Sequence, residues 1–506
     1  MAARQRWILI ATILGSAVVF LDGTIVNVAL PRIGHDLPTR NLATLEAQTY
    51  VYNGYLLALS ALLVLAGALS DAHGRRRMFA LGLIGFGAAS LLCGLAPSIE
   101  ALIVFRIVQG AAGALLVPGS LALLRVNFEG PEAGRAFGLW AAGTSLTVLA
   151  GPFLGGLLVD ILSWRAAFLI NVPLVAFTIY VVQAHVPESR DPEAQPGLDW
   201  IGAALFALAV GGVSFGVIFG QARVWHSVTA WAALGTGFLA ALLLPVWLTR
   251  ARNPLVPPSL FASRNFTVVN LATLAIYGAL YVNAYYAPLF LQGVIGYSAA
   301  AAGLSTLPAG VILVLLSPRA GRLSSEFGPR PFLVAGPLLM AVGALWLARL
   351  PPTSTPWHLD PSAPGTLLPP LSWLVDVLPG TIAVGAGAGL MVTPLTTALM
   401  GSVPEAHASV AAAFNNAISR VGPQLTGALI FVAVSAIFFA LLGAEPAGVS
   451  PLNRPSDPHW LAPAHLASTS AFHAAMAICA GLLSLGALIS LVGLRRPAHT
   501  NTRVSL

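Results

Sequence analysis

Two stretches of the sequence carry the same short pattern and decide the fold. One reads GALSDAHGRRR from Gly67 to Arg77, and the other reads GRLSSEFGPRP from Gly321 to Pro331. The matched positions are Gly67 with Gly321, Leu69 with Leu323, Gly74 with Gly328, and Arg76 with Arg330. Because each stretch joins two closely spaced apolar runs, the chain is expected to contain two halves that fold alike.

The composition indicates a membrane protein. Of the 506 residues, 57% are hydrophobic and only 8% are charged, whereas a soluble domain carries about 25% charged residues. A soluble protein with so little charge could not cover its own surface, and a disordered chain would need high charge and low hydrophobicity. A spanning helix needs about 20 apolar residues, so this composition supplies roughly 14 spans. We therefore predict an all-α integral membrane fold.

Fourteen apolar runs are long enough to cross a bilayer. They lie at 7–30, 50–69, 78–97, 99–124, 137–160, 166–184, 200–220, 229–249, 265–291, 300–317, 331–349, 373–399, 409–441 and 470–494. The first run is too long for the apolar region of a signal peptide, so we interpret it as an uncleaved helix. The segments 350–372 and 442–469 are rich in Pro, Ser and Gly and are expected to be loops.

The arginines predict how the chain is oriented. With the N-terminus inside, 17 arginines fall in inner segments and 6 in outer segments, which is the bias expected of cytoplasmic loops. We therefore predict a multi-pass protein of the plasma (inner) membrane with both termini cytoplasmic. The net charge of +7 fits loops that face anionic lipid.

The repeat and the spans together predict the domain organisation. Residues 1–190 form a six-helix bundle, 191–260 form two inserted transmembrane helices, and 261–506 form a second six-helix bundle. Repeated halves are the usual build of secondary transporters, which bind substrate near the membrane midplane between the halves.

Asp22 is the only acidic residue that lies well inside a predicted span. An intramembrane carboxylate is costly and is a functional candidate by default. The neutral form is cheaper to bury, so Asp22 is a natural proton carrier. The alternative is a structural carboxylate that pairs with a cation in helix packing.

Arg106 is expected at a depth similar to that of Asp22. Asp22 lies about 8 residues, roughly 12 Å, from the outer end of its helix, and Arg106 lies about 7 residues, roughly 10 Å, from the outer end of its own. An ion pair there would be released when Asp22 is protonated, which gives a coupling switch. A fixed structural ion pair is the alternative.

The sequence offers no site for ATP or a metal. A P-loop needs a lysine, and all 25 Lys and Arg residues are arginines. The ten histidines lie in loops or near span ends, while Cys93 and Cys479 are isolated in apolar runs. We expect no cofactor, a proton gradient as the energy source, and no nucleic acid partner.

Several motifs resemble those of the major facilitator superfamily, and more closely its fourteen-helix drug:proton antiporters. They are LDGTIVNVALP (21–31), GALSDAHGRRR (67–77), RIVQGAAGA (106–114), GPFLGGLLVD (151–160), WRAAFLINVP (164–173) and LFLQGVIGYSAAAAGLSTLP (289–308). The resemblance implies the major facilitator fold with two inserted helices. Tyr50 stands where the family often has Trp, which puts in question the family's usual shape of the cavity mouth. Thr147 stands where the fifth-helix motif usually has Gly, which slightly weakens the argument for close helix packing.

The resemblance also implies roles for particular residues. It makes Arg106 the proton-coupling arginine. It implies a cytoplasmic latch that holds the outward-facing state, formed by Gly67, Asp71, Gly74, Arg75 and Arg76 with Arg135 as candidate partner. Arg77 is better explained as an anchor that follows the positive-inside rule. The resemblance places the antiporter motif, which favours export, at Gly151, Pro152, Gly155 and Gly156, where small residues permit close helix approach.

Polar and aromatic side chains near the predicted interface are candidates for the substrate cavity. They are Asn27, Tyr55, Gln109, Tyr277, Tyr281, Asn283, Gln292, Arg420 and Gln424. Tyr277, Tyr281 and Tyr285 recur on one helix face, and such a wall suits apolar or cationic drugs. A lipid-interface belt is the alternative. Arg420 is a candidate to bind either an anionic substrate group or a backbone carbonyl.

These observations predict a proton-coupled exporter of small, amphipathic or drug-like molecules that works by alternating access. The working unit is expected to be a monomer in the lipid bilayer, with protons and a small molecule as its partners. One alternative is a transporter dedicated to a physiological metabolite, lipid or siderophore, as exporter or importer. A membrane-embedded enzyme would need a cluster of catalytic polar residues at a membrane face, and the sequence shows no such cluster.

Overall fold

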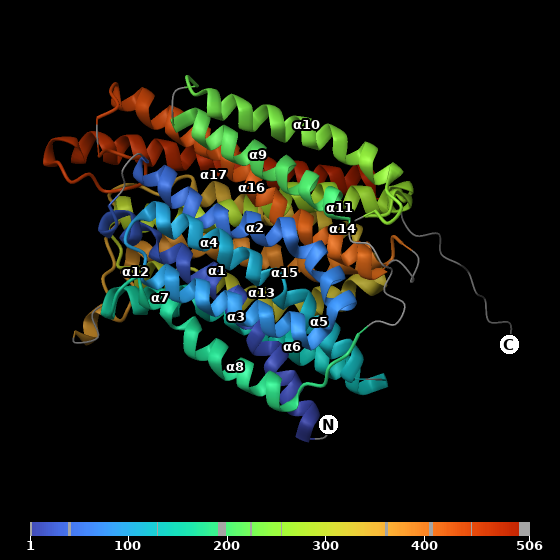
Figure 1. The fold of residues 1–506 in the computed structure, drawn as a ribbon. Coiled ribbons are helices and arrows are strands. Elements are labelled where there is room, and N and C mark those ends of the chain that lie inside the picture. The colour runs from blue at the N-terminus through green and yellow to red at the C-terminus, as the bar shows by residue number, and fades with distance from the viewer. Residues whose placement is uncertain are drawn as a thin grey trace.

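The computed structural model describes residues 3–38, 42–128, 130–190, 199–222, 225–254, 256–359, 363–403, 408–446 and 448–494. Within these ranges the chain forms a bundle of long helices (Figure 1). The first eight are α1 (Ala3–Asp36), α2 (Thr44–His73), α3 (Arg75–Gly94), α4 (Ile99–Gly113), α5 (Leu116–Asn127), α6 (Gly130–Ile161), α7 (Ala166–Leu169) and α8 (Asn171–His185). They make up the N-terminal half.

The rest of the chain adds a helical pair and a second half. The pair is α9 (Trp200–Ala222) and α10 (Val228–Arg250). The C-terminal half contains α11 (Arg264–Phe290), α12 (Ala299–Leu304), α13 (Leu307–Phe327), α14 (Arg330–Leu347), α15 (Leu378–Met400), α16 (Ala408–Leu442) and α17 (Leu461–Gly493). Short 3₁₀ segments lie at Pro258–Ala262, Pro364–Thr366 and Pro458–Trp460, and π-helical turns lie at Leu291–Ile295 and Trp373–Val377.

Most of the predicted spans are long helices. Twelve helices of the described chain are long and apolar enough to cross a membrane. The predicted spans 50–69 and 137–160 fall in α2 and α6, which have 30 and 32 residues and are not among those twelve. All-helical membrane architecture is therefore confirmed, whereas the number of 14 crossings stays a prediction.

Two boundaries differ from the prediction. The segment 442–469 is not a loop throughout, because α17 already begins at Leu461. Histidines 465 and 473 consequently lie inside a helix, where each contacts a backbone carbonyl oxygen, His473 that of Leu350 at 2.8 Å. The helix of the second span begins at Thr44 rather than at residue 50.

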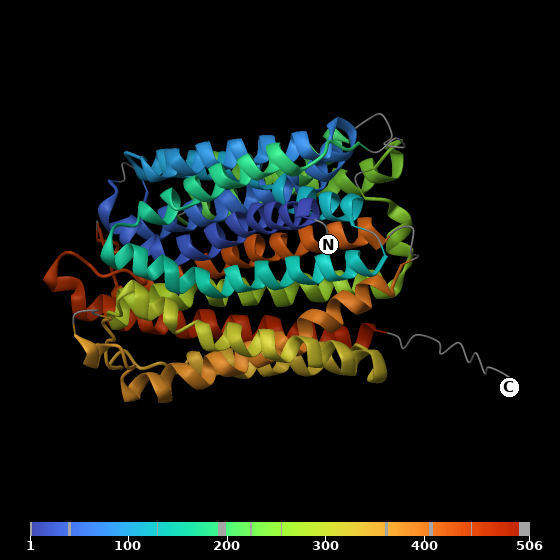
Figure 2. The ribbon, with the colours of Figure 1, turned by 90° about the horizontal axis from the view of Figure 1, so that it is seen from below.

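The two halves lie on opposite sides of the bundle. Figure 2 shows the blue and cyan helices of the N-terminal half gathered on one side and the yellow to red helices of the C-terminal half on the other. The start of α1 and the end of α17 lie at the same end of the bundle (Figures 1 and 2). We call this the termini end, and we call the opposite end, where α12 begins, the far end.

The repeated sequence pattern is repeated in structure. Gly74 ends α2 with φ at 108°, and Gly328 ends α13 with φ at 80°, conformations that glycine adopts readily. Arg76 donates to the carbonyl of Gln183 near the end of α8 at 3.1 Å, and Arg330 donates to the carbonyl of Leu491 near the end of α17. Each arginine thus ties the repeated loop to the last helix of its own half.

The pair α9 and α10 packs as a hairpin, and α9 also contacts α2 and α16. Tyr50 on α2 faces this pair, since its ring lies 5.8 Å from the ring of Phe215 on α9. The residue that departs from the family's Trp therefore contacts α9. The division at residues 190 and 260 stays a prediction.

Candidate functional site

An ion pair lies buried inside the N-terminal half. Asp22 on α1 and Arg106 on α4 are both 0% exposed, and Arg106 Nη1 donates to Asp22 Oδ2. Arg106 Nε also donates to the carbonyl of Val51 on α2 at 3.3 Å. The sequence predicted similar depths for these two residues, and in the structure their side chains are in contact.

Neutral side chains complete the hydrogen bonding around Asp22. Gln109 accepts from Arg106 Nη1 at 2.7 Å and donates through Nε2 to Asp22 Oδ1 at 2.9 Å. Asn171 on α8 donates to the same Oδ1 at 3.2 Å and to Ser90 on α3 at 3.1 Å. Because both carboxylate oxygens accept hydrogen bonds, the protein replaces much of the hydration that a buried carboxylate loses.

Two members of this network were missed by the sequence reasoning. Ser90 looks like an ordinary small residue in an apolar span. Asn171 begins α8, directly after the short break at Ile170 that separates it from α7. A polar residue at a helix break inside a span was the available signal, since such breaks are tolerated only where they are buried in protein or line a cavity.

An aromatic ring covers the remaining face of the arginine. Arg106 Cζ lies 4.1 Å from the centre of the Tyr55 ring, and the Tyr55 hydroxyl donates to the carbonyl of Val19 at 3.1 Å. Arg106 Nη2 has no hydrogen-bond partner within the described chain, so the cation–π contact compensates part of its burial. Tyr55 and Gln109 therefore belong to the ion-pair site, since both are fully enclosed there.

A cavity of about 300 Å³, which we call the central cavity, lies between the two halves. Helices α1, α2 and α6 line it from one side, and α11 and α13 line it from the other. Most of its wall is apolar, and its polar atoms come from Thr24, Asn27, Tyr52, Tyr281 and Thr306. This size and lining suit a small amphipathic molecule.

The predicted tyrosine face lies beside this cavity. The rings of Tyr277 and Tyr281 stack with their centres 6.4 Å apart, and Tyr281 lines the cavity. Tyr285 contacts the ring of Tyr52 at 5.0 Å and the hydroxyl of Thr49 at 3.2 Å. The aromatic wall thus spans both halves, and Tyr52 is the member that the sequence reasoning missed.

Two of the predicted cavity amides join the halves. Asn27 lines the cavity and donates to the carbonyl of Ala284 on α11 at 2.6 Å. Gln292 donates to the carbonyl of Val28 on α1 at 3.1 Å. Gln292 lines hollows at the far end of the bundle rather than the central cavity.

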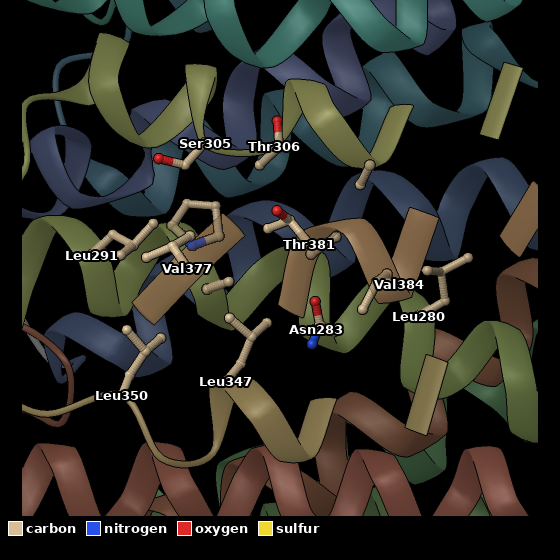
Figure 3. Close-up of a pocket in the computed structure, with 14 residues that line it drawn as sticks. Leu280, Asn283, Leu291, Ser305, Thr306, Leu347, Leu350, Val377, Thr381 and Val384 are labelled. Atoms are coloured by element: carbon tan, nitrogen blue, oxygen red, sulfur yellow. The ribbon is translucent and has the colours of Figure 1, made fainter. Parts of the chain in front are cut away.

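Asn283 lines a second pocket inside the C-terminal half, which shares Ala284, Pro288 and Thr306 with the wall of the central cavity. Figure 3 shows side chains of α11, α14 and α15 and of the α12–α13 connection converging there. The pocket has a volume of about 150 Å³ and an almost wholly apolar wall. Asn283 Nδ2 lies 3.2 Å from Met476 Sδ on α17. Asn283 therefore lines this adjoining pocket and is not among the residues that line the central cavity.

Most of the hydrogen bonds described between the two halves lie at the far end, and those of Asn27 with Ala284 and of Thr49 with Tyr285 lie beside the cavity. Besides that of Gln292, the far-end bonds include Gln48 to Asn453 at 2.9 Å, and the backbone of Leu45 to Ser450 at 3.0 Å. Asp160 at the end of α6 accepts from the backbone amides of Ala299 and Ala300 at 3.1 and 2.7 Å. We call these far-end contacts between the halves the far-end seal.

Removing the Asp160 carboxylate should open this seal more often. A charge-assisted hydrogen bond contributes about 1.5–3 kcal/mol, so Asp160→Ala is expected to raise far-side labelling of a cavity reporter by about tenfold or more. The reporter is Val148→Cys, which lines the cavity, and the measurement is the labelling rate with a membrane-impermeant thiol reagent. Asp36→Asn is the matched control, since Asp36 is an exposed far-end carboxylate on α1. Equal rates in Asp160→Ala and the parent would contradict the assignment.

The antiporter motif packs in two directions. A side chain at Gly151 would overlap Thr24, and a Cβ at Gly155 would lie 2.9 Å from the Cα of Ile25, so these two glycines fit α6 against α1. A Cβ at Gly156 would instead overlap the carbonyl of Ala299 on α12. Pro152 lines the central cavity, and its carbonyl meets Gly303. The motif thus forms part of the far-end contact between the halves.

The predicted latch is only partly described. Gly67, Gly74, Arg75 and Arg76 lie at the α2–α3 junction at the termini end, and Arg135 is an exposed residue of α6. The side chain of Asp71 lies outside the described residues, so its pairing with Arg135 stays a prediction. What the structure adds is Glu188, which follows α8 and accepts from the backbone amides of Arg76 and Arg77, both at 3.1 Å.

Glu188 should stabilise the start of α3. A carboxylate at a helix N-terminus satisfies free amides and opposes the helix dipole. Glu188→Ala is therefore expected to increase proteolytic cleavage at the termini end by a few fold, measured by limited proteolysis in detergent. Arg77→Gln is the matched control, because Arg77 contributes its backbone amide and its side chain is exposed. Cleavage that does not differ between the two variants would refute this role.

Comparison with known proteins identifies relatives over most of the chain. Residues 12–427 match the family model described as Major Facilitator Superfamily. The Multidrug resistance protein Stp of Mycobacterium tuberculosis is 33% identical over 440 residues, covering 87% of this chain and 77% of the relative. The puromycin resistance protein of Streptomyces alboniger is 33% identical, covering 88% and 85%, and the tetracenomycin C resistance and export protein of Streptomyces glaucescens is 31% identical, covering 84% and 75%.

Solved structures share the fold at much lower identity. A bacterial homologue of the human lysosomal transporter Spinster, in an inward-facing and unoccupied conformation, aligns with a TM-score of 0.65 at 18% identity and covers 98% of this chain and 100% of that one. The nucleoside transporter NupG aligns with a TM-score of 0.64 at 11% identity, covering 97% and 100%.

Proposed function

This chain belongs to the Major Facilitator Superfamily, and on that premise we propose that it is a proton-coupled exporter of small amphipathic molecules. It is a multi-pass membrane transporter of a small-molecule substrate rather than an enzyme. In the proposed cycle one proton carrier, Asp22, exchanges its proton for substrate while the two halves rock around the central cavity. The termini end faces the cytoplasm, and the monomer is the working unit.

The buried Asp22–Arg106 ion pair is the observation that carries this proposal. Protonation of Asp22 would cancel the charge that holds the Arg106 guanidinium, and Gln109 and Asn171 would then face a neutral group. Because an uncompensated buried charge costs several kcal/mol, the helices α1 and α4 are expected to repack when the proton arrives. Such a local charge change biases an equilibrium between two global states.

The far-end seal supports the alternating part of the cycle. The contacts of Asp160, Gln48 and Gln292 join the halves on one side of the cavity, so breaking them would expose the cavity to the far side. We propose that this structure corresponds to the state that takes up cargo from the cytoplasm. Protonation of Asp22 in the outward-facing state would return the protein to it.

There are two hypotheses for how many different compounds the protein exports. The aromatic and apolar wall of the cavity supports export of varied amphipathic drugs. A dedicated metabolite exporter is the second candidate, because relatives are named after single compounds, puromycin and tetracenomycin C. The cytoplasmic loading side and the antiporter motif favour export over import.

The test is transport by the purified chain in liposomes. With an imposed pH gradient, substrate addition should drive proton movement against the direction of substrate movement, while empty liposomes should show none. Drug susceptibility of an efflux-deficient bacterium that expresses the chain supplies the panel of dyes and antibiotics. Protection against one compound alone would favour the dedicated exporter, and no pH-driven transport of any compound would refute proton coupling.

A further inference from the structure

A second buried arginine reaches the interface between the halves. Arg420 lies on α16 in the C-terminal half and is 8% exposed. Its Cζ lies 5.9 Å from the ring of Phe20 on α1, which belongs to the N-terminal half. The guanidinium is therefore near the same stretch of α1 that carries Asp22, and it is not part of the ion pair described above.

No acidic side chain neutralises Arg420 in the described chain. Its Nε is buried without a hydrogen-bond partner, and the guanidinium makes no described ion pair or bond to a backbone carbonyl. Asp22 forms the ion pair with Arg106, and Asp160 accepts hydrogen bonds from the backbone amides of α12. Since a buried charge without a partner costs several kcal/mol, this position is suited to a counter-charge that the protein itself does not supply.

Gln424 adds a second unsatisfied group one helical turn along α16. It is 0% exposed, and neither its amide nitrogen nor its carbonyl oxygen has a partner within the described residues. Asn415 on the same helix behaves differently, because its amide donates to Asn270 and Thr273 on α11 at 3.0 and 2.9 Å. The polar side chain used for helix packing is satisfied, whereas Nε of Arg420 and both amide atoms of Gln424 are not.

The surroundings of Arg420 connect it to the cavity wall. Pro423 and Gly427, which follow Arg420 on α16, line a small hollow together with Tyr52 and Tyr281. Tyr52 lines the central cavity, and Tyr277 stacks on Tyr281, which also lines it. The positive group therefore stands at the edge of an aromatic wall.

We propose that the cargo of this transporter is an organic anion, whose carboxylate or ionised hydroxyl group binds Arg420 and Gln424 while its rings lie against the tyrosines. This inference rests on the proposed function. A guanidinium offers a planar pair of donors that match a carboxylate, and the Gln424 amide supplies a further donor. With the Asp22–Arg106 pair neutral overall, Arg420 makes its own part of the interface positive, which disfavours a cationic drug there.

The test compares an acid with its ester. Anthracene-9-carboxylate and its methyl ester share a flat aromatic body and differ in charge, and both can be titrated by fluorescence into the purified full-length chain. The wild-type chain is expected to bind the acid at least about tenfold more tightly than the ester. Arg420→Gln should remove most of that preference, because it removes the charged donors that bind the carboxylate, and should leave ester binding unchanged. Arg420→Lys should retain part of it, and Gln424→Leu should weaken acid binding by a few fold.

Controls separate binding from folding and from the proposed function. Arg319→Gln, at an exposed arginine of α13, is expected to bind both probes like the wild type, and retained ester binding shows that each variant is folded. Equal binding of acid and ester by the wild type, or full acid preference in Arg420→Gln, would overturn the proposal. If the chain exports cations with proton coupling but does not prefer the acid, the anionic cargo is refuted and the proposed exporter function stands. If the chain binds the acid in preference to the ester but transports nothing, the exporter function is refuted and the anion site stands.

Discussion

Asp22→Asn should abolish proton-driven efflux, with at least about a hundredfold loss of the initial rate. Asparagine keeps the shape of the side chain and an oxygen that Gln109 and Asn171 can still donate to, but it neither binds a proton nor neutralises Arg106. The measurement is pH-driven dye transport in everted membrane vesicles. Asp22→Glu keeps a titratable group and is expected to retain part of the activity.

A second variant distinguishes lost coupling from lost folding. Removing one partner of a buried ion pair destabilises a protein by about 3–5 kcal/mol, so Asp22→Asn alone could fail by unfolding. The double change Asp22→Asn with Arg106→Gln removes both charges and should restore normal thermal stability without restoring transport. Proton-driven efflux at the wild-type rate in this double variant would refute the role of Asp22.

Gly156→Val should prevent closure of the far end and reduce transport at least about tenfold. Any Cβ at this position would overlap the backbone of Ala299 and approach that of Ala300 on α12, and backbone atoms cannot rotate away as a side chain can. The cavity should therefore remain open to the far side. The Val148→Cys reporter is expected to react quickly with an impermeant thiol reagent added from that side.

The partner position and two controls make this result specific. Gly303→Ala places a Cβ against the carbonyl of Pro152 in the same contact and should give the same phenotype. Gly235→Ala on α10 has nothing within 4 Å of its new atom and should be silent. Gly110→Ala overlaps the carbonyl of Tyr55 within one half and should lower thermal stability instead. Normal transport by Gly156→Val would show that the halves need not approach here.

The sequence was sufficient for the parts of the fold that depend on burial of apolar surface. Long apolar runs predicted the helices, and the repeated loop predicted equivalent junctions at Gly74 and Gly328, because both signals are local along the chain. The Asp22–Arg106 contact was also predictable, since two charges in helices of known direction can be compared by depth alone.

The sequence was insufficient where a polar side chain contacts a distant helix. Ser90, Asn171, Tyr52 and Glu188 make contacts that depend on which helix faces they occupy and on which helices are neighbours. The early start of α2 has the same origin, because polar residues such as Gln48 are buried there by contacts with the loop around Asn453, and a hydropathy pattern places such residues outside the membrane. The depth of a residue in the membrane can be predicted from the sequence, whereas the rotation of a helix about its axis and the identity of its neighbouring helices cannot.

An anionic cargo, bound by the unpaired charge of Arg420, would change how membrane voltage powers the cycle. Export of a monovalent anion in exchange for one entering proton moves two positive charges inward, whereas export of a monovalent cation for one proton moves none. Each charge that crosses the membrane gains about 2.3 kcal/mol per 100 mV. At 100 mV the anion cycle therefore gains about 4.6 kcal/mol from the voltage, which can sustain roughly a 2,000-fold concentration ratio of the anion across the membrane. An anion exporter of this design would be strongly electrogenic and would continue to work in cells whose pH gradient has collapsed but whose voltage has not.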